Sequence, residues 1–180
     1  AFYFQDPRVA LPDEPVRDRS TSDVVAEVEL NAYKNWNARF AYQWNPDETQ
    51  GERSETFVQY NPTPGRVINA GYRFRRDLLE QVDVSGAWPI NNQWRGFARF
   101  VYSLQEEKTL DQFLGLEYSS CCWAVRVIGR RFISSRSGAA ETSIGLQLEL
   151  KGLSSVGVDN DAFLRDAIRG YSALPSDSRS

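Results

Sequence analysis

The sequence predicts an all-β protein, an antiparallel up-and-down meander of about ten long strands that forms part of a transmembrane β-barrel and ends in a short helix. Three observations predict this fold. Apolar and polar side chains alternate with a period of two along most of the 180 residues. Most of these runs are about 9–11 residues long, whereas strands of soluble sheets usually have about 5–6. Aromatic residues also flank one set of the turns.

The alternating runs are the expected strands. The run from Val24, for example, places Val28 and Leu30 on one side and Glu27 and Glu29 on the other. The first four residues of the chain read as the end of an earlier run, which brings the count to about ten. The other runs cover residues 24–32, 36–45, 52–61, 68–74, 82–88, 94–103, 110–118, 123–130 and 143–151.

The connections between the runs differ in length in a regular way. Outer-membrane barrels place short turns at the periplasmic rim and longer loops outside the cell. We therefore expect the short connections at one rim and the long ones at the other. The short connections are 34–35, 61–65 and 119–120, and the long ones are 5–22, 46–51 and 133–141.

Aromatic residues gather beside the short turns. Their side chains would fall at one rim of a barrel, where a girdle of tyrosine and tryptophan meets the membrane interface. Each of them taken alone is also an ordinary strand residue, because tyrosine and tryptophan favour sheets. The expected girdle consists of Tyr33, Trp36, Tyr60, Trp88, Trp94, Tyr118 and Trp123.

The alternating pattern stops after the last run. Residues 152–157 are expected to form a loop, and residues 159–169 a short helix with its apolar side chains on one face. A helix of this length is marginal alone, so it must dock on the rest of the protein or fray. The polar residues at the end of the chain are expected to be disordered. The chain is therefore divided into barrel strands at residues 1–152 and a periplasmic tail at residues 153–180.

The polar sides of the runs carry many carboxylates and guanidiniums. If the apolar sides meet lipid, these groups line a wet lumen, where they either guide a charged amphiphile or are simply solvated and paired. Two carboxylates, Asp83 and Glu117, also admit a hydrolase site as a weaker interpretation. Three glycines are expected to weaken strand pairing or to allow bulges, namely Gly115, Gly129 and Gly145.

The composition argues against several other classes of protein. The net charge of −3 gives no broad basic surface for nucleic acid. Histidine is absent, which removes the commonest general base and metal ligand. No phosphate loop, metal-ligand spacing or catalytic-triad order occurs, so we expect no cofactor, no metal and no enzyme activity. No apolar run approaches the ~20 residues of a membrane helix.

Methionine is absent and the chain begins at Ala1, which suggests a processed or excised piece.

The only two cysteines, Cys121 and Cys122, are adjacent in the sequence. Neighbouring Cα atoms lie about 3.8 Å apart, below the ~4.4–6.8 Å usual in a disulfide, so a bond between them would be strained. Any other disulfide made here must reach cysteines outside this chain. The plainer alternative is a pair of free thiols.

Several segments resemble the C-terminal region of the LptD family, the lipopolysaccharide-assembly proteins of the Gram-negative outer membrane, also called organic-solvent-tolerance proteins. The opening Phe2-Tyr3-Phe4 before a long loop also fits the middle of that family's barrel. The resemblance extends over essentially the whole chain, and the adjacent cysteines are its most specific feature. The matching segments are Gly115–Tyr118, Cys121–Trp123, Leu146–Leu150 and Gly152–Ser155.

The resemblance implies a fold, a function and partners. The family fold is a very large outer-membrane barrel preceded by a periplasmic jellyroll, and this chain would supply the last strands of the barrel. The implied role is in the translocon that inserts lipopolysaccharide into the outer leaflet through the barrel lumen and a lateral gate. The implied partners are lipopolysaccharide, the lipoprotein plug LptE and the periplasmic lipopolysaccharide-transport bridge.

The resemblance also implies roles for particular residues. Cys121 and Cys122 would form disulfides with cysteines of the N-terminal region. The gate strand would be the last alternating run, which consists of Ser143, Ile144, Gly145, Leu146, Gln147, Leu148, Glu149, Leu150 and Lys151.

A barrel that lacks its front strands would leave two strand edges unsatisfied, and we expect such a piece to transport nothing by itself. The alternative is a small self-contained outer-membrane barrel with a structural or adhesion role. That alternative leaves the adjacent cysteines and the C-terminal tail unexplained.

Overall fold

The computed structural model describes residues 23–31, 34–46, 50–134, 138–151 and 154–172. The expected strand at residues 1–4, Tyr33 of the expected girdle and the last eight residues of the chain lie outside these ranges. The elements are β1 (Val24–Leu30), β2 (Trp36–Asn45), β3 (Gln50–Thr63), β4 (Arg66–Arg75), β5 (Leu79–Pro89), β6 (Trp94–Ser103), β7 (Lys108–Ser119), β8 (Trp123–Ile133), β9 (Ala140–Leu150), β10 (Ser154–Gly157) and α1 (Asn160–Ala167).

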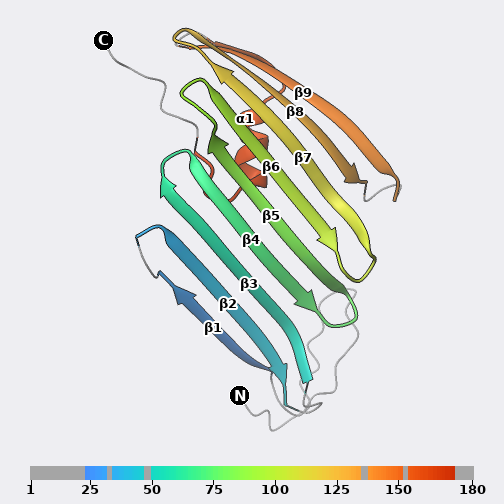
Figure 1. Cartoon of the computed structure of the whole chain (residues 1–180). Helices are drawn as coiled ribbons and strands as arrows, with labels where there is room; N and C mark the ends of the chain where they lie inside the picture. Colours follow the sequence, from blue (N-terminus) through green and yellow to red (C-terminus); the bar gives the residue numbers. More distant parts are fainter. Residues whose placement is uncertain (1–22, 32–33, 47–49, 135–137, 152–153, 173–180) are drawn as a thin grey trace.

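The ten strands form one antiparallel sheet in which every strand pairs with its neighbours along the chain (Figure 1). The predicted all-β meander with one short helix is confirmed. In the described part of the chain, β1 and β10 form the two edges and the sheet does not close. Each edge strand therefore presents backbone groups that have no ladder partner on one side.

The predicted loop at residues 152–157 is wrong where the structure describes it. Ser154–Gly157 forms β10 and pairs with residues 147–150 of β9. The physical reason is that β9 offers an open edge, and a segment that turns back beside it satisfies the backbone groups of both. Val156 lies opposite Leu148, so β10 also extends the apolar set of β9.

Two further expectations need correction. The ladders from β7 through β9 run without a shift of register past Gly115, Gly129 and Gly145, so these glycines do not produce bulges. The alternation of loop lengths is also weaker than expected. Residues 76–78 and 104–107 close hairpins at the rim where longer loops were expected, because pairing continues almost to the turns.

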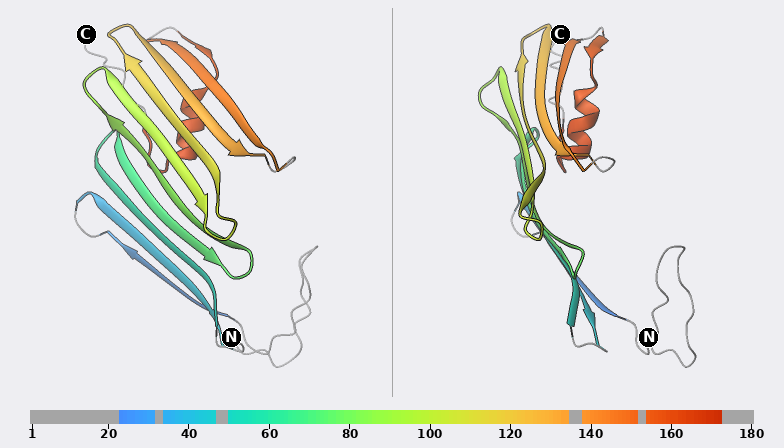
Figure 2. Two further views of the ribbon diagram at one scale, coloured as in Figure 1. Left: turned by 45° about the vertical axis from the view of Figure 1, so that its right-hand side comes forward. Right: turned by 90° about the vertical axis from the view of Figure 1, so that its right-hand side faces the viewer.

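The sheet has two chemically different faces. Figure 2 shows α1 against one face, which we call the inner face, and the opposite face is the outer face. Successive side chains point to opposite faces of a sheet. In β6, Arg95 and Phe97 are buried on the inner face, whereas Trp94 and Phe100 are exposed on the outer face. No helix in the described ranges is long and apolar enough to cross a bilayer.

The hydrophobic core lies between the inner face and the segment that contains α1. Leu164 and Ile168 have no exposed surface. Phe163 meets Phe113 edge to face with the ring centroids 5.1 Å apart. The sequence predicted this apolar helix face, and the structure confirms that it docks on the sheet. The buried members of the core are Val67, Ala87, Phe97, Phe113, Ile128, Leu164, Ile168 and Tyr171.

The core predicts a clear difference between two substitutions in full-length protein that contains this chain. Phe97→Ala should lower the free energy of unfolding by about 3–5 kcal/mol, because the ring is almost completely buried and its loss leaves a cavity. Leu78→Ala, in the exposed turn between β4 and β5, should change it by less than about 0.5 kcal/mol. Equilibrium denaturation in detergent micelles measures both. Equal effects would contradict the assignment of the core to the inner face.

Candidate functional site

The outer face is an extended apolar surface. Large aliphatic and aromatic side chains from most of the strands are exposed on it, without any element of the described chain covering them. An exposed apolar surface of this extent marks contact with a membrane or with another protein. Representative members are Phe40, Ile68, Val84, Phe100, Leu114, Leu116, Val127, Ile144, Leu146 and Leu148.

The structure brings six of the seven expected girdle residues to one rim, which we call the aromatic rim. This rim carries the turns of the hairpins β1–β2, β3–β4, β5–β6 and β7–β8 (Figure 1). Trp36 and Tyr60 lie with ring centroids 4.6 Å apart, and Trp94 and Tyr118 lie 5.0 Å apart. The row continues from Tyr118 to Trp123 at 5.2 Å. Trp88 lies at the same rim, at the end of β5. Contact with a membrane interface stays a prediction.

The inner face is charged, and its charges are paired across strands. Asp83 of β5 binds Arg99 of β6 through two hydrogen bonds of 2.6 and 3.2 Å. Similar pairs join the strands of the other hairpins whose turns lie at the aromatic rim. These are Glu27–Arg39 in β1–β2, Glu55–Arg73 in β3–β4, and both Asp111–Arg130 and Glu117–Arg126 in β7–β8.

The pair between Glu117 and Arg126 differs from the others because it is buried. Each side chain is only 7% exposed, whereas the side chains of Glu27 and Arg39 are 49% and 43% exposed. Arg126 Nε donates to Glu117 Oε2 at 2.7 Å, and Arg126 Nη1 donates to Gln147 Oε1 at 2.9 Å. A buried charge that loses its partner is costly, so this pair fixes β7, β8 and β9 relative to one another.

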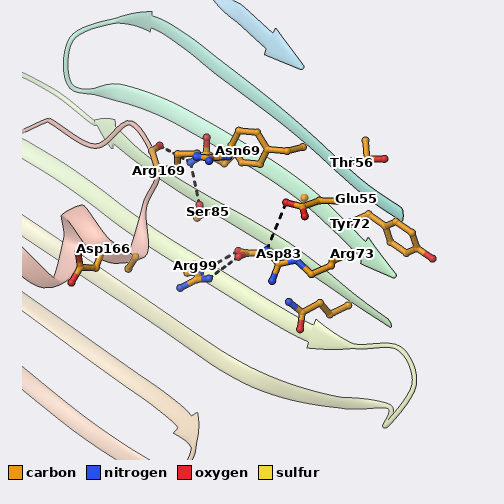
Figure 3. A pocket seen from close by; sticks show the side chains of 14 residues that line it. Glu55, Thr56, Asn69, Tyr72, Arg73, Asp83, Ser85, Arg99, Asp166 and Arg169 are labelled. Atoms are coloured by element: carbon orange, nitrogen blue, oxygen red, sulfur yellow. Dashed lines mark hydrogen bonds and ion pairs between the residues drawn. The ribbon is translucent and has the colours of Figure 1, made fainter. Parts of the chain in front are cut away.

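A cavity of ≈ 220 Å³ opens on the inner face between strands β3 to β6 and the end of α1. Figure 3 shows Asp83 and Arg99 paired in its wall. Asn69 donates to Ser85 Oγ at 3.3 Å and to the Arg169 carbonyl oxygen at 2.9 Å. The lining is polar and of mixed charge, as expected for a surface that faces water inside a barrel.

The structure argues against the interpretation of Asp83 and Glu117 as a paired hydrolase site. The two carboxylates belong to separate arginine pairs, one in β5–β6 and one in β7–β8. Each carboxylate accepts hydrogen bonds from its own arginine, which favours a structural role for both. Within the described ranges, no group of three or more acidic, cysteine or histidine side chains is placed to hold a metal ion.

Cys121 and Cys122 lie exposed in the turn between β7 and β8, at the aromatic rim, and are not bonded to each other. Their sulfur atoms are 2.9 Å apart. The hydrogen bond from Cys122 lowers the pKa of Cys121, and Ser120 adds to this effect. The same contact raises the pKa of Cys122. The pair therefore loses its first proton from Cys121, and both sulfurs are free to react with other groups.

The expected gate strand lies beside this turn. Residues 143–150 belong to β9, and Lys151 lies just beyond it. Lys151 Nζ donates to the Ser120 carbonyl oxygen at 2.6 Å, and Lys151 N donates to the Cys122 carbonyl oxygen at 2.9 Å. β9 is not the last strand, because β10 pairs with its end nearest the aromatic rim. A role in gating stays a prediction.

Together these features define an antiparallel meander of the kind that builds barrel walls, apolar on one face and charged on the other. A family model described as "LPS transport system D", LptD, matches residues 1–94. The LPS-assembly protein LptD of Nitrosomonas eutropha is 42% identical over 168 residues, which cover 93% of this chain and 23% of the relative. The chain belongs to the LptD family.

Other relatives give the same result. The LPS-assembly protein LptD of Xylella fastidiosa is 39% identical over 94% of this chain, and that of Nitrosococcus oceani is 36% identical over 94%. The chain spans less than a quarter of the length of these relatives, with 22% and 23% covered.

Some residues packed against the inner face were not singled out by the sequence. Tyr171 and Asp161 bind each other through a 2.9 Å hydrogen bond, and Asp161 also lies 3.7 Å from Arg126. The available signal was the spacing of Leu164, Ile168 and Tyr171, which share one face of the C-terminal segment. Their charged partners lie in distant strands, and spacing in the sequence does not reveal such contacts.

The cysteine pair predicts an unequal response to pH in reduced full-length protein. Because its pKa is lowered, Cys121 should be alkylated by iodoacetamide at lower pH than an ordinary thiol. Cys122→Ala removes the hydrogen bond, so the alkylation profile of Cys121 should move to higher pH. Peptide mass spectrometry across a pH series gives both profiles. An unchanged profile for Cys121 in this variant would contradict the inferred contact between the sulfurs.

The buried and exposed ion pairs predict unequal losses of stability. Glu117→Ala in full-length protein should lower the free energy of unfolding by about 3–5 kcal/mol, because Arg126 is left buried without its carboxylate. Glu27→Ala breaks an exposed pair and should cost less than about 1 kcal/mol. Denaturation in detergent micelles compares the two variants. Similar losses would show that burial of the Glu117–Arg126 pair does not govern its contribution.

Proposed function

We propose that this chain forms part of the wall of an outer-membrane β-barrel that inserts lipopolysaccharide into the outer leaflet of a Gram-negative bacterium. Family membership supports lipopolysaccharide as the transported molecule, because the curated relatives are named LPS-assembly proteins. The placement in a membrane is supported chiefly by the difference between the two faces of the sheet, because the outer face is apolar and the inner face is charged. Strands β2 to β9 have 10–14 residues each, which suits the crossing of a bilayer by tilted strands.

The arrangement gives each surface a role in this proposal. The outer face contacts acyl chains, and the aromatic rim lies at the periplasmic interface. The inner face lines the lumen, where the saccharide part of lipopolysaccharide passes beside paired charges. Residues 140–145 of β9 extend beyond the ladder with β10, and this free part of the edge forms the lateral gate with strands outside this chain. Residues 1–152 form the barrel part, and residues 153–180 begin on the periplasmic side.

The cysteines fit the same orientation. The turn at Cys121 and Cys122 lies at the aromatic rim and therefore in the periplasm, an oxidising compartment. Their exposure suits disulfides to the N-terminal region of the full-length protein, one from each sulfur. The plug lipoprotein LptE and the periplasmic transport bridge are further proposed partners. A small self-contained barrel is disfavoured, because β1 and β10 leave two open edges in the described sheet.

The test begins with the disulfides of full-length protein taken from membranes. Peptide mapping under non-reducing conditions should find Cys121 and Cys122 bonded to two different cysteines of the N-terminal region. Two free thiols, or a bond between the two, would overturn this part of the proposal.

The same cysteines predict a functional loss. Cys121→Ser with Cys122→Ser should abolish most delivery of pulse-labelled lipopolysaccharide to the cell surface, because the proposed disulfides can no longer form. Ser120→Ala, in the same turn, is the matched control and should leave delivery unchanged. Normal delivery by the double cysteine variant would contradict the proposed role of these disulfides.

A further inference from the structure

The segment from residue 158 to residue 172 crosses the inner face from the β9–β10 edge to the middle of the sheet (Figure 2). We call it the C-terminal clasp. We propose that this clasp ties the β9–β10 edge to strands β3 to β6, so that the edge opens only when the clasp leaves the inner face. The coupling between the clasp and the edge does not depend on the proposed function; only the biological role of the opening, as a lateral gate, rests on it.

The clasp is continuous with the edge strand. Gly157 ends β10 with φ of 116°, a conformation that favours glycine, and a Cβ there would overlap the Leu146 carbonyl oxygen. The next residue, Val158, donates its N–H to that same carbonyl oxygen at 3.1 Å. The chain therefore turns directly from the ladder of β9 onto the inner face. No flexible linker therefore lies between β10 and the clasp.

The first anchor of the clasp lies on β9 itself. Asn160 N donates to Gln147 Oε1 at 3.1 Å. Asn160 packs so closely over Gly145 that a Cβ at position 145 would lie only 2.6 Å from Asn160 Oδ1. The carboxylate of Asp159 caps α1 by accepting from Ala162 N at 3.0 Å. The helix thus begins in direct contact with the strand next to the edge.

The second anchor is the buried charge cluster of β7 and β8. Asp161 lies beside Arg126, with 3.7 Å between Oδ1 and Nη1. The Tyr171 hydroxyl donates to Asp161 Oδ1 at 2.9 Å, so the two ends of the clasp are joined across α1. Burial raises the pKa of Tyr171, which keeps the hydroxyl protonated as a donor. Leu164 and Ile168 fill the space between these polar contacts and the core.

The third anchor lies near the middle of the sheet, far from the edge. The Arg169 carbonyl oxygen accepts from Gln59 Nε2 at 3.0 Å and from Asn69 Nδ2 at 2.9 Å. Arg95 is 2% exposed and lies over the ring of Tyr171 at 4.8 Å.

The last described residue of the clasp completes this third anchor. Arg95 Nη2 donates to the Ser172 carbonyl oxygen at 2.9 Å, and Gly65 N donates to Ser172 Oγ at 3.1 Å. The far end of the clasp is thus fixed to β3, β4 and β6.

These anchors make the clasp a mechanical link. Outward movement of β9 and β10 away from β8 would pull Asn160 off Gln147 of β9 or Asp161 off Arg126 of β8, or would drag α1 away from the core. A segment that is held at both ends and has no slack resists such movement until the whole segment undocks. Local opening of the edge and undocking of the clasp should therefore be one cooperative event.

Hydrogen–deuterium exchange on full-length protein in detergent micelles, without lipopolysaccharide, tests this coupling. Leu164→Ala leaves a cavity at the centre of the clasp, so amides of β10 and residues 140–150 should exchange at least about tenfold faster, together with those of α1. Peptides of β5 and β6 should be unchanged. Ala162→Ser, on the exposed side of α1, is the matched control and should leave every rate unchanged.

Tyr171→Phe provides a second, milder variant that keeps the ring and removes only the hydrogen bond to Asp161. It should accelerate exchange in α1 and β10 together by a smaller factor than Leu164→Ala. Faster exchange in α1 with unchanged β9 and β10 would overturn the coupling. Equal acceleration throughout the sheet would overturn it too, as would no change in α1 in both variants. None of these results depends on transport, so they are distinct from failure of the proposed function.

Discussion

The strict alternation of side chains along the strands is the constraint on which the rest of the structure depends. In a pleated sheet a shift of register by one residue moves a complete set of side chains to the other face. Such a shift in β8 would place Arg126 on the apolar outer face and Val127 among the charges of the inner face. The apolar surface, the paired charges and the docked helix therefore require one register throughout the sheet.

The inner face is stabilised by two kinds of contact that support each other. Cross-strand ion pairs join the strands of the four hairpins whose turns lie at the aromatic rim, and the C-terminal segment joins these hairpins to one another. Arg126 takes part in both, because it binds Glu117 within one hairpin and lies beside Asp161 of the clasp. Water is excluded there by Leu164 and Ile168, which strengthens the electrostatic contacts beside them. The region near the β9–β10 edge is thus more firmly fixed than an isolated edge strand would be.

The sequence was sufficient for strands β1 to β9, their order and the apolar face of the helix, because these depend on local periodicity. Trp94 and Tyr118 lie together at the aromatic rim because they flank turns that are recognisable from the sequence, while their role in a girdle stays a prediction. The sequence did not reveal β10, because four residues are too few for alternation to be distinct from a loop. It also did not reveal the contacts of Arg95 and Tyr171. These depend on how a segment after the last strand folds back over strands more than seventy residues earlier.

The central claim is that the outer face meets lipid and the inner face meets water. Spin labels placed singly at residues 37–42 of β2, in full-length protein in liposomes, test it most directly, because this strand lies away from α1. Collision with oxygen should peak at positions 38, 40 and 42, and collision with a water-soluble nickel complex at positions 37, 39 and 41. A nickel signal that is equal at all six positions, or that peaks at 38, 40 and 42, would contradict the account.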